Sequence, residues 1–226
     1  MPSYFVTSTG TGIGKTLSTA LLLRQLAAAG RPARAIKPVI SGFDPQSAAE
    51  SDAGILLAAM GQRATEDAIA AIAPWRFAAP LSVDMASGRE GRSVDFDALV
   101  AWCRAQERDD ALLIEGAGGV MAPIDDRHVM RDWIAALGTP ALLVTGSYLG
   151  TLSHTLTALV ALRDKGIHVV AAIIAASPGS PVSVQETAEV IARHGQVVTR
   201  VVPRLTIGAD GLPDLAGTPD LSDLIG

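Results

Sequence analysis

TSTGTGIGKT, residues 7–16, lies between a short apolar run at residues 4–6 and a helix-like run at residues 17–29. A glycine-rich turn between a strand and a helix lets backbone N–H groups close on phosphate oxygens, and the helix dipole favours the anion. The spacing predicts that Lys15 reaches the terminal phosphates and that the Thr16 hydroxyl ligates Mg²⁺. The strict motif G-x-x-x-x-G-K-[ST] begins with glycine, where this chain has Thr9. We therefore interpret the stretch as a variant phosphate-binding loop, because a chance Lys-Thr pair would not require the order strand, turn and helix.

Short apolar runs rich in Val, Ile and Leu recur between helix-like segments. They lack polar alternation, which is typical of parallel strands buried on both faces. The alternation of strands and helices predicts a P-loop NTPase-like, doubly wound α/β fold, with a mainly parallel sheet, helices on both faces and right-handed crossovers. Residues 207–226 are predicted to be irregular, with one short helix near the end. The expected strands are residues 4–7, 33–37, 111–115, 140–145, 169–175 and 197–202, and expected helices include residues 17–29, 52–60 and 95–106.

Length and composition predict one domain over residues 1–226, since 226 residues with 49% hydrophobic content can bury one core. The net charge of −5, with no basic run, argues against a nucleic-acid surface and against a polybasic membrane patch. No apolar stretch is long enough to span a bilayer, and the first residues do not resemble a signal peptide, so a cytoplasmic location is expected. The single Cys103 fits a reducing compartment and is expected to pack in a helix.

Polar side chains stand at the ends of the first three expected strands, where ligands bind in such sheets. The phosphate loop follows the first strand, Lys37 ends the second, and Glu115 ends the third. Pro38 favours an extended backbone at Lys37, and Ser41 follows within reach of the same edge. Lys37 could be an ordinary ion-paired lysine and Glu115 a turn cap, but their positions favour phosphate contact and Mg²⁺ binding. Asp52 starts an expected helix, where the dipole alone would favour a carboxylate, so its role stays open at this point.

Six sequence blocks occur in the order and approximate spacing of the dethiobiotin synthetase family, and the chain resembles that family from residue 4 to about residue 203. No single block is specific, but six in order over most of the chain would rarely arise by chance. The blocks are the phosphate loop, KPVISG at 37–42, SDA at 51–53, FAAP at 77–80, EGAGG at 115–119 and LGTLSH at 149–154.

The resemblance implies a ligase of biotin biosynthesis that closes a cyclic urea on 7,8-diaminononanoate, with CO₂ or bicarbonate, ATP and Mg²⁺. One substrate amine would capture CO₂ as a carbamate, which attacks the γ-phosphate, and the second amine would then attack the mixed anhydride. The carbamate is already an anion, so its phosphorylation needs positioning and charge neutralisation rather than a general base. Lys15 and Lys37, with Mg²⁺, would supply that neutralisation.

The resemblance also implies roles for individual residues. Lys37, Lys15 and Thr11 would act at the reacting groups, and Thr16, Asp52 and Glu115 would hold the metal. The glycines at 116, 118 and 119 would let backbone approach the ligand closely. The diamine would contact Lys37, Ser41 and Gly118, and its acid tail would cross a homodimer interface to the partner's Leu149, Gly150, Thr151 and Ser153. The nucleotide-binding set implied by the family is Gly12, Ile13, Gly14, Lys15, Thr16, Leu17, Asp52, Glu115, Gly116, Ala117, Gly118, Ala175, Ala176, Pro203, Arg204 and Leu205.

Two departures from the family pattern bear on the nucleotide. Gly12 stands where members commonly have an acidic residue. Ala176 and Ser177 stand where many relatives have an Asn-Asp pair that reads the adenine edge. Since an alanine side chain cannot hydrogen-bond a base, we hypothesise weaker discrimination among nucleoside triphosphates, with the backbone of residues 203–205 still able to read the base.

Three other classes of protein compete with this interpretation. A partitioning or carrier ATPase of the same fold usually has a lysine five residues before the loop lysine, where this chain has Gly10, and a DNA-partitioning member would use a basic surface. A glutamine-dependent synthetase would need a glutaminase domain with a cysteine nucleophile, which neither the chain length nor Cys103 provides. A nucleotide-binding scaffold without turnover would not need Lys37. The four histidines, with no metal-ligand spacing, are expected to be structural.

Overall fold

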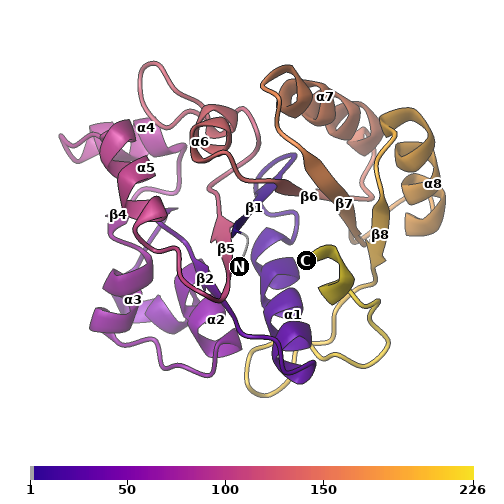
Figure 1. The fold of residues 1–226 in the computed structure, drawn as a ribbon, viewed down its shortest axis with the longest axis horizontal. Helices are drawn as coiled ribbons and strands as arrows, with labels where there is room; N and C mark the ends of the chain where they lie inside the picture. Colours follow the sequence, from indigo (N-terminus) through magenta and orange to yellow (C-terminus); the bar gives the residue numbers. More distant parts are fainter. Residues whose placement is uncertain (1–2) are drawn as a thin grey trace.

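The computed structural model describes residues 3–226 and is built around a six-stranded sheet (Figure 1). The strand order is β2-β5-β1-β6-β7-β8, and every neighbouring pair is parallel. These strands coincide with the six predicted apolar runs, with ends that differ by at most two residues, so the expected parallel α/β sheet is confirmed. Their bounds are β1 Ser3–Ser8, β2 Ala33–Ile36, β5 Ala111–Glu115, β6 Ala141–Gly146, β7 Val169–Ala175 and β8 Thr199–Val202.

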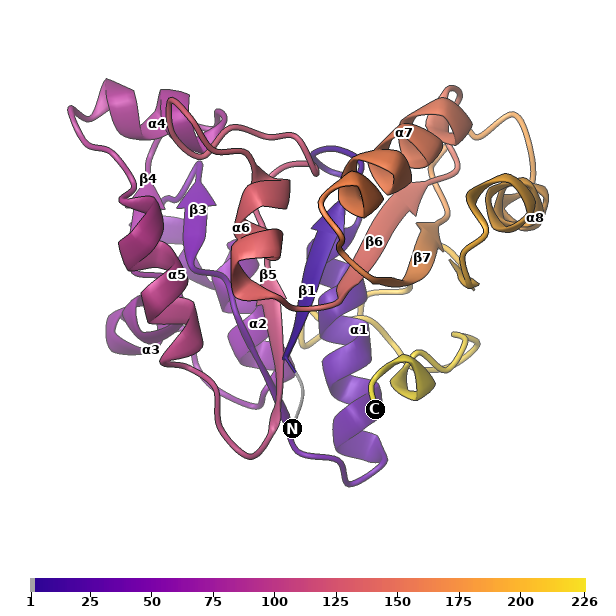
Figure 2. The ribbon, with the colours of Figure 1, turned by 45° about the horizontal axis from the view of Figure 1, so that its top comes forward.

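Helices cover both faces of this sheet because successive strand residues point to opposite sides. In β1, Phe5 faces α5, α6 and α7, whereas Tyr4 and Val6 face α1 and the C-terminal segment. Figure 2 shows α6 and α7 over one side of the sheet and α1 behind it. The helix bounds are α1 Lys15–Ala28, α2 Asp52–Ala59, α3 Glu66–Ile72, α4 Val83–Arg89, α5 Phe96–Arg104, α6 Met130–Leu137, α7 Thr151–Asp164 and α8 Val184–Gly195.

The segment between β2 and β5 forms a smaller unit on the β2 side of the sheet (Figure 1). It contains a parallel pair of short strands, β3 Val39–Ser41 and β4 Trp75–Phe77, and the 3₁₀ helix η1 Pro45–Glu50. Its own small core joins β3 to α2 and α3 through Ile40, Leu57 and Ile69. The sequence analysis did not predict β3 or β4, which are too short to show a period. This unit carries Ser41 and Asp52 to the edge where β1, β2 and β5 end.

Two further predictions, on residues 207–226 and on Cys103, can be compared with the structure. Residues 207–226 contain one short 3₁₀ helix, η2 Ser222–Leu224. Cys103 is buried in α5, and burial raises the pKa of its thiol to about 12, so it packs as expected and is a poor nucleophile. Within residues 3–226, none of the helices has both the length and the apolar character required to cross a bilayer.

Candidate active site

The phosphate loop connects β1 to α1 and is hydrogen-bonded to the neighbouring strand β6 through the Thr9 N–H and the Val144 carbonyl. Gly12 and Gly14 have φ of 72° and 92°, left-handed values that favour glycine, so an acidic residue in place of Gly12 would be strained here. The Ser8 hydroxyl donates towards two carbonyls, those of Gly10 and Gly118, at 2.8 and 2.9 Å. These contacts tie the loop to the glycine-rich segment after β5.

Thr9 explains how the loop tolerates the loss of the first motif glycine. Its hydroxyl lies 3.1 Å from the Thr145 hydroxyl at the end of β6, and its N–H donates to the carbonyl of Val144 at 3.0 Å. The side chain is therefore anchored to β6 and does not fill the loop. The variant motif keeps its shape because the two glycines with positive φ are at positions 12 and 14.

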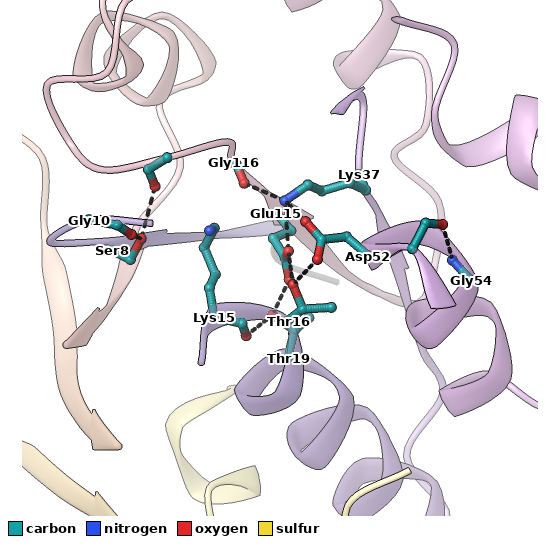
Figure 3. A network of polar contacts seen from close by, with 12 residues as sticks. Ser8, Gly10, Lys15, Thr16, Thr19, Lys37, Asp52, Gly54, Glu115 and Gly116 are labelled. Carbon is teal, nitrogen blue, oxygen red and sulfur yellow. Dashed lines mark hydrogen bonds and ion pairs between the residues drawn. The ribbon is translucent and has the colours of Figure 1, made fainter. Parts of the chain in front are cut away.

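Lys37, Asp52 and Glu115 form one network with Thr16 (Figure 3). The Lys37 Nζ lies 2.8 Å from Asp52 Oδ2 and 2.9 Å from Glu115 Oε1, and it donates to the Gly116 carbonyl at 2.8 Å. Thr16 Oγ1 lies 2.8 Å from both Asp52 Oδ1 and Glu115 Oε1. Side chains from β5, α1, α2 and the segment after β2 thus meet at one point, as the strand-end argument predicts.

The electrostatics of this network follow from burial and charge. Burial alone would lower the pKa of Lys37, but the carboxylates of Glu115 and Asp52 outweigh it and raise that pKa. Burial and then the nearby Lys37 ammonium lower the pKa of Lys15 to about 8. Burial would raise the pKa of Asp52, but Lys37 and Thr16 lower it to about 2. Lys37 and Asp52 are therefore charged at neutral pH, and Lys15 is the ammonium closest to losing its proton.

The oxygens around Thr16 suit a hard divalent cation. Two carboxylates and one hydroxyl converge, and one hydroxyl hydrogen cannot satisfy both carboxylates at once. In residues 3–226, no three His, Cys, Asp or Glu side chains cluster as a complete metal cage. Mg²⁺ is usually held by one or two carboxylates together with water and phosphate oxygens, so this incomplete set fits it.

Three adjoining cavities run past the loop. One of about 270 Å³ lies at residues 175–178 and 202–205, and it shares Gly12, Gly14 and Leu17 with a second cavity of about 470 Å³. The second cavity is lined by Lys37, Asp52 and Thr16 and shares Thr11, Ser41 and Gly118 with a third of about 430 Å³. The predicted site residues Glu115 and Gly116 line none of the three, and Glu115 lies fully buried behind Lys37 and Thr16. A nucleotide with its base in the first cavity and its phosphates in the second would leave the third cavity for a second substrate.

The predicted nucleotide and substrate residues mostly lie in these walls. Ala175, Ala176, Pro203, Arg204 and Leu205 line the first cavity together with Ile13, and Ala117 lines the other two. The sequence analysis missed other wall residues. Pro80 and Ile40 belong to the quoted blocks FAAP and KPVISG, which could have indicated a role, whereas nothing in the sequence marked the rest. The missed residues are Ser18, Pro178, Val202 and Ile207 in the first cavity, Ile40 and Ile55 in the second, and Pro80, Leu81, Ser82, Val83 and Ala122 in the third.

Ser177 lines the first cavity, but its hydroxyl is engaged elsewhere. Its Oγ accepts from the Ser147 N–H at 3.0 Å, and Ser147 Oγ accepts in return from the Ser177 N–H at 3.0 Å. This reciprocal pair joins the ends of β6 and β7. Ala176 beside it has no polar side-chain atom, so among the side chains at these two positions only the remaining O–H hydrogen of Ser177 could donate to a base.

Protein atoms already crowd two of the glycines after β5. A Cβ on Gly116 would lie 2.8 Å from Phe5 Cε1, and one on Gly119 would lie 3.1 Å from the Gly10 nitrogen. Close approach of a ligand to these glycines stays a prediction. Gly118, with φ of 67°, is the one that requires a left-handed backbone and lines a cavity.

The block at residues 149–154 lies apart from the phosphate loop. Among residues 3–226, the cavity of about 320 Å³ beside Leu149 shares no wall residue with the three cavities above. Leu149 is 86% exposed, and Ser153 is exposed on α7. Thr151 is buried, with its hydroxyl donating to the Gly146 carbonyl at 2.7 Å, so it stabilises the turn at Gly150. Direct contact of Thr151 with a substrate stays a prediction.

Comparison with known proteins gives one family. A family model described as an AAA domain matches residues 2–207. The chain is 51% identical over 197 residues to the ATP-dependent dethiobiotin synthetase BioD of Acidiphilium cryptum (strain JF-5), which covers 86% of this chain and 88% of that protein. It is 46% identical over 212 residues to the protein of the same name from Methylobacterium nodulans, and the match covers 90% of this chain and 94% of that protein.

Several solved structures have a similar fold, although their sequence identity to this chain is low. The MinD cell division protein of Aquifex aeolicus matches with a TM-score of 0.56 and 14% identity, over 99% of this chain and 94% of that chain. The MinC:MinD complex of the same organism matches with a TM-score of 0.55 and 17% identity, over 94% of this chain and 87% of that chain. Chloroplast FtsY from Physcomitrella patens matches with a TM-score of 0.51 and 14% identity, over 99% of this chain and 63% of that chain. These similarities show a shared P-loop fold and nothing about activity.

Proposed function

We propose a division of roles among the side chains of this chain, which belongs to the dethiobiotin synthetase family. The chain is a ligase of biotin biosynthesis that uses ATP to form dethiobiotin. The family's reaction uses a diamine, CO₂ and ATP, so the carbamate formed from the first two, an anion, must meet the γ-phosphate. The order of the three cavities supports placing the base at residues 175–177 and 203–205, the phosphates at Lys15 and the diamine beside Ser41.

The chemistry requires charge neutralisation more than proton transfer. One diamine nitrogen bonds to CO₂ and loses a proton, giving a carbamate whose oxygen attacks the γ-phosphorus as ADP leaves. The second nitrogen then attacks the carbonyl carbon, and phosphate leaves as the ring closes. Lys15 and Lys37 reduce the repulsion between carbamate and phosphate, which is the main protein contribution in phosphoryl transfer. Thr11 lies in the wall shared by the second and third cavities, where it can contact the reacting groups.

Thr16, Asp52 and Glu115 would hold Mg²⁺. When bound, the ion would neutralise charge on the β- and γ-phosphates. The converging oxygens at 2.8 Å support this assignment. Lys37 touches both carboxylates and lines the second cavity together with Ser41, which the second cavity shares with the third.

A homodimer would complete the diamine site. The cavity beside Leu149 is separate from the phosphate side, so the acid tail would reach residues 149, 150, 151 and 153 from the partner subunit. We also propose that residues 1–226 form one domain. In support, Leu221 and Ile225 near the C-terminus pack in the same core as β1. A cytoplasmic location is supported by the use of ATP and by the lone buried thiol of Cys103.

The observation that carries the mechanism is the position of Lys37 between Asp52 and Glu115 in the cavity wall. The test supplies 7,8-diaminononanoate, bicarbonate and MgATP and measures dethiobiotin by mass. Lys37→Ala is expected to lower the rate at least about a hundredfold because it removes charge at the transferred group. Lys165→Ala is the matched control, since Lys165 pairs with Asp132 outside the three cavities. Near-normal activity of Lys37→Ala would remove Lys37 from the mechanism.

A further inference from the structure

Thr19 contacts Glu115 of the site network, and neither the phosphate-loop motif nor the family resemblance assigns it a role. It lies in α1 one turn after Lys15 and is 1% exposed. Its Oγ1 lies 2.7 Å from Glu115 Oε2 and 3.0 Å from the Lys15 carbonyl (Figure 3). A threonine hydroxyl has one hydrogen, so it can donate fully to one of these acceptors.

The carboxylate is the better acceptor of the two. A hydrogen bond to an ionised group is shorter and stronger than one between neutral groups, which agrees with the shorter distance to Glu115. The Lys15 carbonyl, in the first turn of α1, also receives the helical N–H four residues later. The ordinary bond of a helical threonine back to its own helix therefore does not account for this contact.

The two oxygens of Glu115 have different partners. Oε1 meets Lys37 Nζ at 2.9 Å and Thr16 Oγ1 at 2.8 Å. Within residues 3–226, Thr19 is the only side chain that donates to Oε2. Glu115 is fully buried, so loss of this donor would leave Oε2 without a partner or let the carboxylate rotate.

We propose that Thr19 is a positioning residue, which fixes the Glu115 carboxylate so that Oε1 faces Thr16 and Lys37 and is available to the divalent cation. Thr19 acts through Glu115 and touches no reactant. The inference rests on the proposed metal role of Glu115. Side chains that orient metal ligands typically change metal affinity or activity about 10- to 100-fold when they are removed.

The test measures Mn²⁺ binding by electron paramagnetic resonance on the full chain, with a non-hydrolysable ATP analogue present. Thr19→Val keeps the shape and removes the hydroxyl, so the Mn²⁺ Kd is expected to rise about tenfold or more. Thr19→Ser restores the hydroxyl and should lie within about threefold of the wild type, a rescue that simple packing would not give. The Mg²⁺ concentration for half-maximal activity should follow the same order.

Thr139→Val is the matched control, because the Thr139 hydroxyl is buried and has no partner among the described residues. Its Mn²⁺ Kd should not change. If Thr19→Val does not fold, Thr19→Ala provides the same loss of hydroxyl with less crowding.

Glu115→Gln separates this inference from the proposed function. If Glu115→Gln weakens Mn²⁺ binding and the folded Thr19 variants lacking the hydroxyl do not, Thr19 is not a positioning residue while the metal assignment survives. If Thr19→Ser is as weak as Thr19→Val, the hydroxyl is not responsible and the inference also fails. If Glu115→Gln has no effect, Glu115 is not a metal ligand, and both proposals fall together.

Discussion

Lys15 is the lysine of the site network whose pKa lies nearest to neutral pH. Burial and the neighbouring Lys37 lower the pKa of Lys15 to about 8, so near pH 9 most of the free enzyme holds it neutral. Bound phosphates raise the pKa of an adjacent ammonium. ATP binding at about pH 9 is therefore expected to take up about one proton, and binding at about pH 7 far less. Titration calorimetry in two buffers of different ionisation enthalpy measures this uptake.

Lys15→Arg provides the comparison, because arginine stays protonated throughout this range. It should bind ATP without proton uptake at either pH, if the fork of arginine is accommodated. Absence of proton uptake at about pH 9 in the wild type would mean that Lys15 is already fully charged before ATP arrives.

Ala176 and Ser177 leave the base pocket poor in polar side-chain atoms, since the Ser177 hydroxyl is paired with Ser147. We expect turnover with ATP, CTP and GTP to differ by less than about a thousandfold, because strong selection requires polar groups that a wrong base leaves unpaired. Steady-state kinetics with each triphosphate checks this. Ala176→Asn should change the ratios about tenfold, whereas Ala176→Val adds bulk without a hydrogen bond and should not favour one base. A thousandfold preference for ATP in the wild type would contradict the hypothesis.

At the residue scale, the sequence predicted which residues gather but not all of their contacts. Lys37 and Glu115 were placed by one rule, that ligands bind at the carboxyl ends of parallel strands. The contacts of Thr19 and Ser177 depend on which neighbours α1 and β7 meet, and no local pattern encodes that. The protein atoms that crowd Gly116 and Gly119 were not predicted either, because they come from β1 and the phosphate loop, far away in the sequence.

At the scale of elements, the phosphate loop depends on the segment after β5. A Cβ on Gly119 would lie 3.1 Å from backbone atoms of Thr9 and Gly10, so Gly119→Ala must push the loop by a few tenths of an ångström. Small displacements of positioning groups reduce catalysis strongly, and we expect kcat/KM for ATP to fall about tenfold or more in a folded protein. Kinetics together with thermal unfolding measures both effects.

Gly88→Ala is the control for this change. Gly88 lies inside α4, and a Cβ there would meet no atom within 4 Å. Because alanine is the better helix former, the free energy of unfolding should rise by up to about 1 kcal/mol, with kcat/KM unchanged. Full activity of Gly119→Ala would show that the segment after β5 does not support the loop.

The predictability of the elements followed their length and burial. The six strands of the main sheet are continuous apolar runs, and all six were predicted. β3 and β4 have three residues each and pair only with one another, so no period marks them in the sequence. They are held by packing, since Ile40 of β3 belongs to the small core with α2 and α3, and Phe77 of β4 belongs to the main core. That unit nonetheless brings Asp52 to the site, which is why the role of Asp52 could not be decided from its place at a helix start.

At the scale of the whole molecule, the apolar surface at the start of α7 argues for a second subunit. Leu149 is 86% exposed and Leu152 and Val182 are 37% and 51% exposed around the same cavity. A large exposed apolar patch commonly marks an interaction site. We expect the wild type to have twice the chain mass of 23.3 kDa in solution, and Leu149→Asp to shift it to one chain, because a charge buried in an interface is costly.

The same substitution separates binding of the nucleotide from use of the diamine. If the acid tail crosses to the partner, Leu149→Asp should lose diamine turnover while ATP still binds, and Ser153→Leu should raise KM for the diamine about tenfold with little change for ATP. Val198→Asp changes an exposed valine outside this cavity and should keep both the mass and the kinetics. Light scattering and steady-state kinetics on the same samples decide the matter. A Leu149→Asp protein that is a single chain and turns over the diamine normally would place the whole substrate site within one subunit.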